Sequence, residues 1–193
     1  MKPGVRIAGG EHRGRGLAVP AGARPTEGRV REALFSIWNE RLPGARLLDL
    51  FAGSGVVGLE ALGRGALTVL AVDEGVRALA ALETNAERLR TTGFAVRRVI
   101  LPKGLARLAR EGPYDLVFAD PPYDFASYEE LLFAVAPLLT ADGEVAIEHS
   151  SRRALPVVAG RLVRVDERRY GESVLSFYRV AEPAAVSPNG ASA

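Results

Sequence analysis

The chain has 193 residues, of which 48% are hydrophobic and 25% are charged, and it contains no cysteine. This composition is typical of a single globular domain that buries its own core, and the lack of cysteine excludes disulfides, zinc–thiolate sites and thiol catalysis. No apolar run approaches the roughly 20 residues that a membrane helix needs. The N-terminal sequence MKPGVRIAGG has no apolar signal segment. We therefore expect a soluble, cytoplasmic protein.

The net charge is only +2, but positive side chains are concentrated at the N-terminus. Residues 1–31 hold seven Lys or Arg side chains and two Glu side chains. A basic arm on a near-neutral body indicates a polyanionic partner. Two alternatives remain open: a solvated basic tail, and pairing of two of the arginines with Glu27 or Glu32. The arginines that we expect to bind RNA phosphates are Arg6, Arg13, Arg15, Arg24, Arg29 and Arg31.

In chain order, the first expected element is a short hairpin within residues 5–20, with Gly9 and Gly10 near its turn, although the sequence RGRG is equally typical of flexible chain. A helix follows at 31–42, with Thr26 as a candidate cap and Trp38 as a helix-packing residue. Strand and helix patterns then alternate along the chain. The strands are expected at 46–51, 67–72, 95–100, 115–119 and 144–149, and the helices at 56–65, 75–92, 104–112 and 128–139.

This alternation predicts an α/β fold in which a mostly parallel sheet carries helices on both faces. Two strand-like runs flank Gly171 within residues 161–180, with no helix between them, and predict a terminal antiparallel hairpin. The small and Pro-containing stretch 181–193 is expected to be a disordered tail. The predicted division is a basic arm at 1–27, one α/β domain at 28–180 and the tail.

The glycine-rich sequence DLFAGSGVVG joins the first of the alternating strands to its helix. Gly53, Gly55 and Gly58 match the G-x-G-x-x-G pattern, and Asp73 follows Gly53 by 20 residues at the end of the next strand. Glycines let a ligand approach the backbone, and the acid accepts hydrogen bonds from a ribose diol. Asp49 would repel a pyrophosphate and attract an ammonium group, which favours S-adenosylmethionine over NAD. The alternative is a turn that only packs strand on helix.

The sequence FADPPYDF, residues 118–125, ends the fourth alternating strand, since proline is poorly tolerated inside a sheet. We expect the Asp120 carboxylate and the Pro121 carbonyl to accept the two N–H groups of an exocyclic amine, which localises the nitrogen lone pair toward a methyl donor. Pro122 holds Pro121 extended, and Tyr123 offers a ring on which a flipped base stacks. The alternative is a proline turn with a core tyrosine.

DLFAGSG and DPPY, three strands apart, resemble the amino-group methyltransferases of the Rossmann-like, class I S-adenosylmethionine type. The resemblance is closest to the RsmD family, which methylates guanine N2 in 16S (small-subunit) ribosomal RNA, because the N-terminal region contains RIAGGEHRGRGLAVP and RPTEGRVREALF. It extends over residues 5 to about 179. The resemblance implies a seven-stranded sheet with a reversed last strand and an N-terminal hairpin that helps hold RNA. It also implies a monomer that acts on 16S ribosomal RNA or on an assembling small subunit.

The resemblance also assigns site residues. The methionine and ribose side of the cofactor falls to Asp49, Phe51, Gly53, Ser54 and Gly55, the ribose hydroxyls to Asp73, and the target amine to Asp120, Pro121, Pro122 and Tyr123. Related enzymes carry Asp or Asn near the adenine, where this chain has Leu101, Pro102 and Lys103. No side chain is therefore assigned to the adenine.

Of the two histidines, His12 is expected to contact phosphate or solvent, and His149 is expected to be structural or to lie on the rim of the site. No metal site is expected. An adenine-N6 DNA methyltransferase shares the amine chemistry but usually needs a separate recognition domain, for which the chain has no room. A protein-glutamine methyltransferase usually carries Asn before the two prolines. A non-catalytic RNA-binding protein on this fold would be expected to carry a damaged motif, and both motifs are intact.

Overall fold

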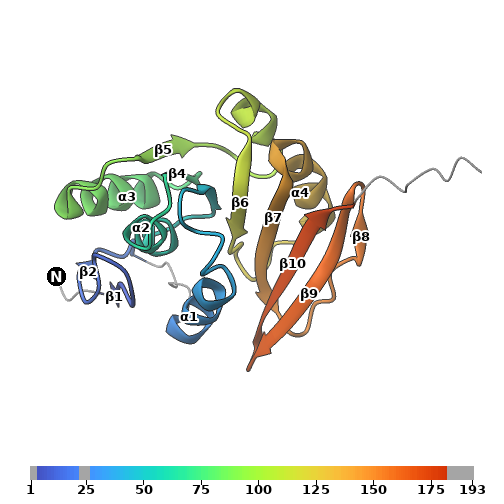
Figure 1. Ribbon diagram of the computed structural model, residues 1–193, viewed down its shortest axis with the longest axis horizontal. Helices are drawn as coiled ribbons and strands as arrows, with labels where there is room; N and C mark the ends of the chain where they lie inside the picture. Colours follow the sequence, from blue (N-terminus) through green and yellow to red (C-terminus); the bar gives the residue numbers. More distant parts are fainter. Residues whose placement is uncertain (1–3, 22–26, 182–193) are drawn as a thin grey trace, which may run out of the picture.

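The centre of the molecule is an eight-stranded sheet with the strand order β5-β4-β3-β6-β7-β10-β9-β8 (Figure 1). The computed structural model describes residues 4–21 and 27–181. Neighbouring strands from β5 to β7 in this order are parallel, and β10 lies antiparallel between β7 and β9. The strands are β3 (Arg46–Leu50), β4 (Thr68–Asp73), β5 (Phe94–Arg98), β6 (Tyr114–Ala119), β7 (Leu139–Ser150), β8 (Val158–Ala159), β9 (Leu162–Tyr170) and β10 (Ser173–Val180).

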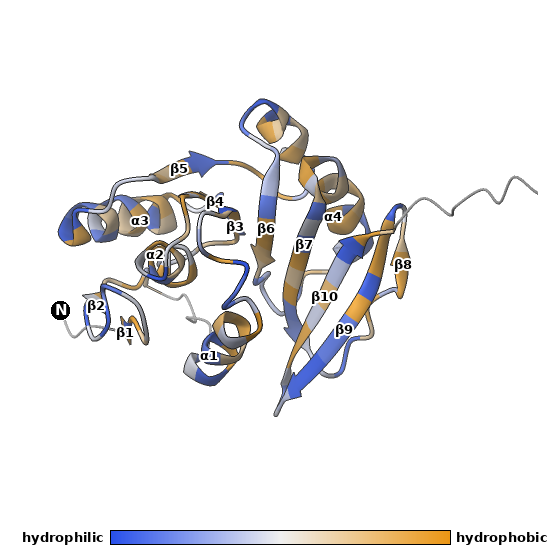
Figure 2. Ribbon diagram, in the orientation of Figure 1, coloured by the Kyte–Doolittle hydropathy of each residue, from blue (hydrophilic) through white to orange (hydrophobic). Residues whose placement is uncertain are grey.

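This arrangement confirms the predicted α/β fold with a reversed last strand and a terminal hairpin. The seven predicted strands are all present, and β8 adds an eighth at the outer edge. Because β8 has two residues, it produces no alternating pattern in the sequence. Strand β9, which it flanks, is hydrophilic along most of its length (Figure 2), and all but one of its residues are exposed or partly exposed.

Helices cover both faces of the sheet (Figure 1). One core cluster packs α1 (Gly28–Ile37), α2 (Val56–Gly63) and α3 (Val76–Leu89) on one face, and the other packs η1 (Leu105–Arg110), α4 (Tyr128–Val135) and η2 (Ala136–Leu138) on the opposite face. Side chains alternate along a strand, so Leu47 joins the first cluster while Leu48 and Leu50 join the second. Asp49 therefore faces the same side as α2.

Three expected helices differ in the structure. The helix predicted at 128–139 is divided into α4 and η2, and its last residue, Leu139, begins β7. The helix predicted at 104–112 is the 3-10 helix η1, in which the buried Leu105 and Leu108 are three residues apart, the length of one 3-10 turn. Helix α1 ends at Ile37, and Trp38 follows it. Trp38 packs fully buried, as predicted, and its indole N–H also donates to Glu144 Oε1 at 2.7 Å. This bond ties the end of α1 to β7.

The N-terminal hairpin is formed by β1 (Val5–Arg6) and β2 (Gly16–Leu17). Ile7 and Leu17 are buried in the same cluster as α1 and α2, so the hairpin is docked on the helices of this face. The turn contains Gly10 at φ +72°, and Glu11 N–H donates to the Gly63 carbonyl at 2.8 Å. Predictions about Arg24, Thr26 and the tail at 182–193 concern positions outside the described residues. Among the described helices, none is long and apolar enough to cross a membrane.

Candidate active site

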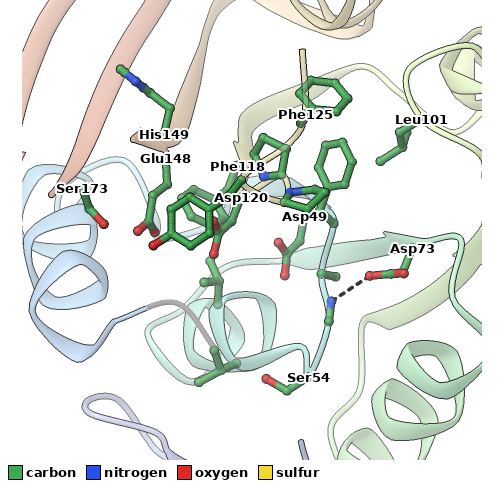
Figure 3. Close-up of a pocket in the computed structure, with 18 of the residues that line it drawn as sticks. Asp49, Ser54, Asp73, Leu101, Phe118, Asp120, Phe125, Glu148, His149 and Ser173 are labelled. Atoms are coloured by element: carbon green, nitrogen blue, oxygen red, sulfur yellow. Dashed lines mark hydrogen bonds between the residues drawn. The ribbon is translucent and has the colours of Figure 1, made fainter. Parts of the chain in front are cut away.

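A cavity of about 490 Å³ opens at the carboxyl ends of β3, β4, β6 and β7 (Figure 3). Parallel sheets place ligands at this edge because the loops after the strands converge there. Nine of the ten residues predicted for the cofactor and the target amine line this one cavity: Asp49, Phe51, Gly53, Ser54, Asp73, Asp120, Pro121, Pro122 and Tyr123. Gly55, the tenth, lies directly behind the loop as the residue that precedes α2.

The three glycines of the loop have different physical roles. Gly53 has φ +55°, and among the described residues a Cβ there would meet only the Phe51 carbonyl oxygen, at 3.9 Å. Gly53 therefore faces open space in which a ligand can approach the backbone. A Cβ on Gly55 would lie 2.6 Å from Leu82, and one on Gly58 would lie 2.7 Å from Val69. These two glycines allow α2 to pack closely on its neighbours.

The loop backbone is held in place by Asp73. Its carboxylate accepts the Gly53 N–H at 3.0 Å and the Gly75 N–H at 2.8 Å, one on each oxygen. Each oxygen of an ionised carboxylate has a further acceptor site, so Asp73 can bind hydroxyl groups of a ligand without releasing the loop. The end of β4 is thereby fixed against the loop that follows β3.

Phe51 adopts a backbone conformation that the sequence does not reveal. Its φ is +58°, in the left-handed region, which costs a residue with a Cβ about 1–3 kcal/mol and occurs most often at functional sites. Flanking hydrogen bonds from Ala52 N–H to the Val72 carbonyl, at 3.0 Å, and from Gly55 N–H to the Ala52 carbonyl, at 2.7 Å, hold it there. The strained turn places the Phe51 ring in the cavity wall.

Asp49 is an acid whose pKa its surroundings strongly raise. Only 2% of its surface is exposed, and burial raises its pKa from 3.8 to about 7. The negative charges of Asp120 and Asp73 also raise the pKa, against a hydrogen bond that Gly58 N–H donates at 3.1 Å. A cationic ligand in the cavity would favour the ionised form.

The Asp-Pro-Pro-Tyr segment leaves the sheet directly after β6. Asp120 N–H donates to the Leu50 carbonyl at 3.5 Å, and Phe125 N–H donates to the Pro122 carbonyl at 2.9 Å. The segment therefore forms a closed turn beside the glycine loop. Pro121 is buried, whereas the Tyr123 side chain is 61% exposed at the cavity mouth. Tyr123 is thus not in the core, contrary to the alternative of a plain proline turn.

A row of aromatic rings, of which only Phe51 was predicted as a site residue, forms part of the cavity wall. Phe51, Phe125, Tyr128 and His149 follow one another with ring centroids 5.3, 5.1 and 6.3 Å apart, each pair edge to face. Such pairs are favourable beyond their buried area. They connect the loops after β3 and β6 with α4 and β7, and so stiffen this side of the cavity.

Glu148, His149 and Ser173 also line the cavity and were missed as site residues. His149 was expected to be structural or on the rim, and it is buried, with its Nε2 2.8 Å from Ser176 Oγ and its Nδ1 3.1 Å from the Ser150 carbonyl. Burial lowers the pKa of His149. Glu148 had a detectable signal, because it lies near the end of an apolar strand, as Asp73 and Asp120 do.

The predicted phosphate contacts fall into two groups. Arg6, Arg13, Arg15 and Arg29 are exposed on the hairpin and at the start of α1, which leaves them accessible to a polyanion. Arg31 does not fit its prediction, since it is 3% exposed.

The cause of the Arg31 burial is Glu60, which is fully buried in α2. Arg31 Nε donates to Glu60 Oε2 at 3.1 Å, and Arg64 Nη2 donates to Glu60 Oε1 at 2.7 Å. Ala8 N–H also donates to Glu60, at 3.0 Å, and Arg31 Nη2 donates to the Arg6 carbonyl at 2.8 Å. Arg31 thus fastens the hairpin to the domain instead of binding phosphate.

The fold is that of the class I methyltransferases, whose cofactor is S-adenosylmethionine. A solved structure of the ribosomal protein L11 methylase from Lactobacillus delbrueckii subsp. bulgaricus shares this fold, with a TM-score of 0.69 over 86% of each chain at 21% identity. A hypothetical protein of Thermus thermophilus has a TM-score of 0.79 and 35% identity, over 91% of this chain and 99% of its own.

The chain belongs to the family described as Conserved hypothetical protein 95, which matches residues 5–179. It is also 34% identical to the Ribosomal RNA small subunit methyltransferase D of Escherichia coli strain K12, over 91% of this chain and 89% of that protein. The resemblance to the RsmD family that the motifs indicated is therefore confirmed.

Proposed function

We propose that this protein transfers a methyl group from S-adenosylmethionine to the exocyclic N2 of a guanine in 16S ribosomal RNA. The observation that carries the proposal is the placement of Asp120 and Pro121 in the same cavity as the glycine loop and Asp73. Amine acceptors and a cofactor loop that share one cavity can bring a nucleophile and a methyl donor into line. The ribosomal substrate is supported by the similarity to Ribosomal RNA small subunit methyltransferase D, and it would place the protein in the cytoplasm.

The residues present fit this cofactor. Gly53 leaves open backbone for the ligand, and the free acceptor capacity of Asp73 suits the ribose diol. Asp49 offers a carboxylate to the ammonium of the methionine moiety. Leu101 lines the cavity, as do Phe51 and Phe125, so apolar contacts on these side chains take the place of an acidic side chain at the adenine.

Bound S-adenosylmethionine supplies a methyl group activated by a positively charged sulfur. The nitrogen lone pair of a base amine is delocalised into the ring and must be freed for attack. The Asp120 carboxylate and the Pro121 carbonyl accept the two N–H bonds and turn that lone pair out of the ring plane. Asp120 is also positioned to take the proton that nitrogen releases. Tyr123, exposed at the mouth, stacks on the flipped base, which is worth about 1–3 kcal/mol.

The chain supplies most of its rate enhancement by positioning, since a fixed geometry replaces the entropy of bringing two reactants together. The closed turn after β6 and the strained turn at Phe51 keep the two halves of the cavity rigid. The exposed arginines Arg6, Arg13, Arg15 and Arg29 hold phosphates of the RNA outside the cavity. One protein molecule carries all of these parts, which is consistent with action as a monomer.

The test is methyl transfer from labelled S-adenosylmethionine to 16S ribosomal RNA, to small-subunit particles and to duplex DNA, followed by nucleoside analysis. The expected product is N2-methylguanosine in RNA or particles. Label in N6-methyladenine of DNA would support methyl transfer to an exocyclic amine but refute ribosomal RNA as the substrate. Binding of the cofactor with no label in any acceptor would favour a non-catalytic protein on the same fold.

A further inference from the structure

Three neighbouring strands bring a row of polar side chains to the cavity. Asp120 directly follows β6, Glu148 lies near the end of β7, and Ser173 begins β10. Ala119 pairs with Ile147 across β6 and β7, so Asp120 and Glu148 follow equivalent positions on adjacent parallel strands. Figure 3 shows the Glu148 side chain between those of Asp120 and Ser173, in the same cavity.

We infer that Glu148 selects guanine, by accepting a hydrogen bond from the ring N1–H while Asp120 and Pro121 hold the N2 amine. The inference rests on the proposed function and names the residue that decides which base is methylated. Guanine is the only common RNA base whose exocyclic amine is bonded to a carbon next to a ring N–H. In adenine and cytosine, the ring nitrogen beside the amine is an acceptor instead.

Because Glu148 is buried, the difference between a ring N–H donor and a ring acceptor beside the amine is expected to have a large effect on binding. The residue is 7% exposed, so water cannot readily separate it from a base whose polar edge does not match it. A base with an acceptor beside its amine would turn a lone pair toward the carboxylate, in surroundings where such a mismatch is costly. Sites built to hydrogen-bond a polar substrate group reject analogues that lack it by large factors.

The order of the three side chains also matches the edge of guanine. Along β6, β7 and β10 the cavity presents a carboxylate acceptor, a second carboxylate acceptor and the hydroxyl of Ser173, which can donate. The Watson–Crick edge of guanine presents the N2 donors, the N1 donor and the O6 acceptor in the same sequence. Adenine offers a donor and then an acceptor, so its second group opposes Glu148.

Glu144, four residues earlier on the same strand, is a glutamate with a structural role. It is also buried, but it lies outside the cavity lining. It accepts hydrogen bonds from Trp38 Nε1 at 2.7 Å and from Arg179 Nε at 2.6 Å. Glu144→Gln is therefore a matched control, because it neutralises a buried carboxylate on β7 without touching the substrate.

The experiment compares two small-subunit RNAs, one with guanine at the methylated position and one with 2-aminopurine, introduced by ligation. 2-Aminopurine keeps the amine at C2 but has an acceptor at N1. We expect the wild-type kcat/KM to favour guanine by about 100-fold or more. Glu148→Gln, whose amide can donate to the bare N1, is expected to bring this preference below about tenfold. Glu144→Gln is expected to keep the wild-type preference even if it unfolds more easily.

The preference is a ratio within one protein preparation, so a lower folded fraction does not change it. Wild-type protein that methylates 2-aminopurine as well as guanine would overturn the inference without any variant. An unchanged preference in Glu148→Gln would overturn it as well. Wild-type protein that methylates no guanine in any acceptor would instead refute the proposed function, so the two failures are distinguishable.

Discussion

Replacing Asp49 by Asn is the most direct probe of the electrostatics of the cavity. The amide is nearly isosteric with the carboxyl group, and its oxygen can still accept the hydrogen bond from Gly58 N–H that measures 3.1 Å in the structure. The substitution therefore removes a titratable charge while it keeps the packing and the loop contact. Any difference that depends on pH then reports the ionisation of Asp49.

The magnitude follows from the raised pKa. Between pH 3.8 and about 7 the native state holds a proton on Asp49 that the unfolded chain has lost. Native protein therefore binds more protons, and the free energy of unfolding falls as pH rises through this window. Each pH unit in this window lowers the free energy of unfolding by about 1.4 kcal/mol, so the total decrease is roughly 4 kcal/mol once the pH exceeds 7. Of this, roughly 2–3 kcal/mol is lost between pH 5 and pH 8.

The assay is urea unfolding of wild-type protein and Asp49→Asn at pH 5, 6, 7 and 8, without cofactor. The stability advantage of the variant is expected to grow by about 2–3 kcal/mol from pH 5 to pH 8 and to level off above pH 7. Asp115→Asn is the control, since Asp115 Oδ2 also accepts a backbone N–H, from Arg46 at 2.8 Å, but at the opposite end of the sheet. An advantage that does not change with pH would refute the reasoning.

The same variant is expected to bind S-adenosylmethionine about tenfold or more weakly at pH 8, because it loses a charge-assisted contact to the ammonium. Wild-type affinity is expected to rise from pH 6 to pH 8 as Asp49 ionises. Calorimetric titration across this range measures both effects. Equal affinities of the two proteins at pH 8 would show that Asp49 does not contact the cationic group.

Three further variants test other parts of the protein. Asp120→Ala is expected to lower methyl transfer by about 100-fold or more with cofactor affinity nearly unchanged, and full activity in the labelled transfer assay would remove Asp120 from the mechanism. Replacing Arg13 and Arg15 together by Ala is expected to flatten the slope of the logarithm of the RNA-binding constant against the logarithm of the salt concentration by about 1.5. An unchanged slope would support the alternative that the arm is only a solvated basic tail. Glu60→Gln is expected to cost about 3 kcal/mol or more of unfolding free energy, because it removes the buried negative charge that faces the Arg31 and Arg64 guanidinium groups, and a thermal melt like that of wild type would contradict this.

The sequence predicts the sheet well because strand and helix periods differ and alternate cleanly. It predicts the cavity for a related reason: parallel strands bring their carboxyl ends together, so Asp49, Asp73 and Asp120 had to converge. The misassignment of Arg31 shows the limit. Its role depends on Glu60, which lies 29 residues away in α2, and separation along the chain does not show that the two side chains meet. A glutamate inside the apolar helix 56–63 was the available hint.

Other features are invisible because they are properties of the backbone or of spacing. The left-handed φ of Phe51 comes from the tight turn between β3 and α2. A sequence indicates a positive φ mainly through glycine, so a phenylalanine at this position gives no sign of it. The 3-10 form of η1 was missed because leucines three residues apart suit both helix types. Glu148 was the most avoidable omission, since it repeats the pattern of an acid near the end of an apolar strand.

The distribution of charge explains how an acidic cavity can serve a polyanionic substrate. Asp49, Asp73, Asp120 and Glu148 all line the cavity, so it attracts a cationic cofactor and repels phosphate. The exposed arginines lie instead on the hairpin and the start of α1, beside α2 (Figure 1). An RNA held by its phosphates on that basic surface can enter the cavity only with a neutral base turned out of its stack. The buried network around Glu60 fixes the hairpin to α2, and it thereby fixes where the exposed arginines of the hairpin lie relative to the cavity.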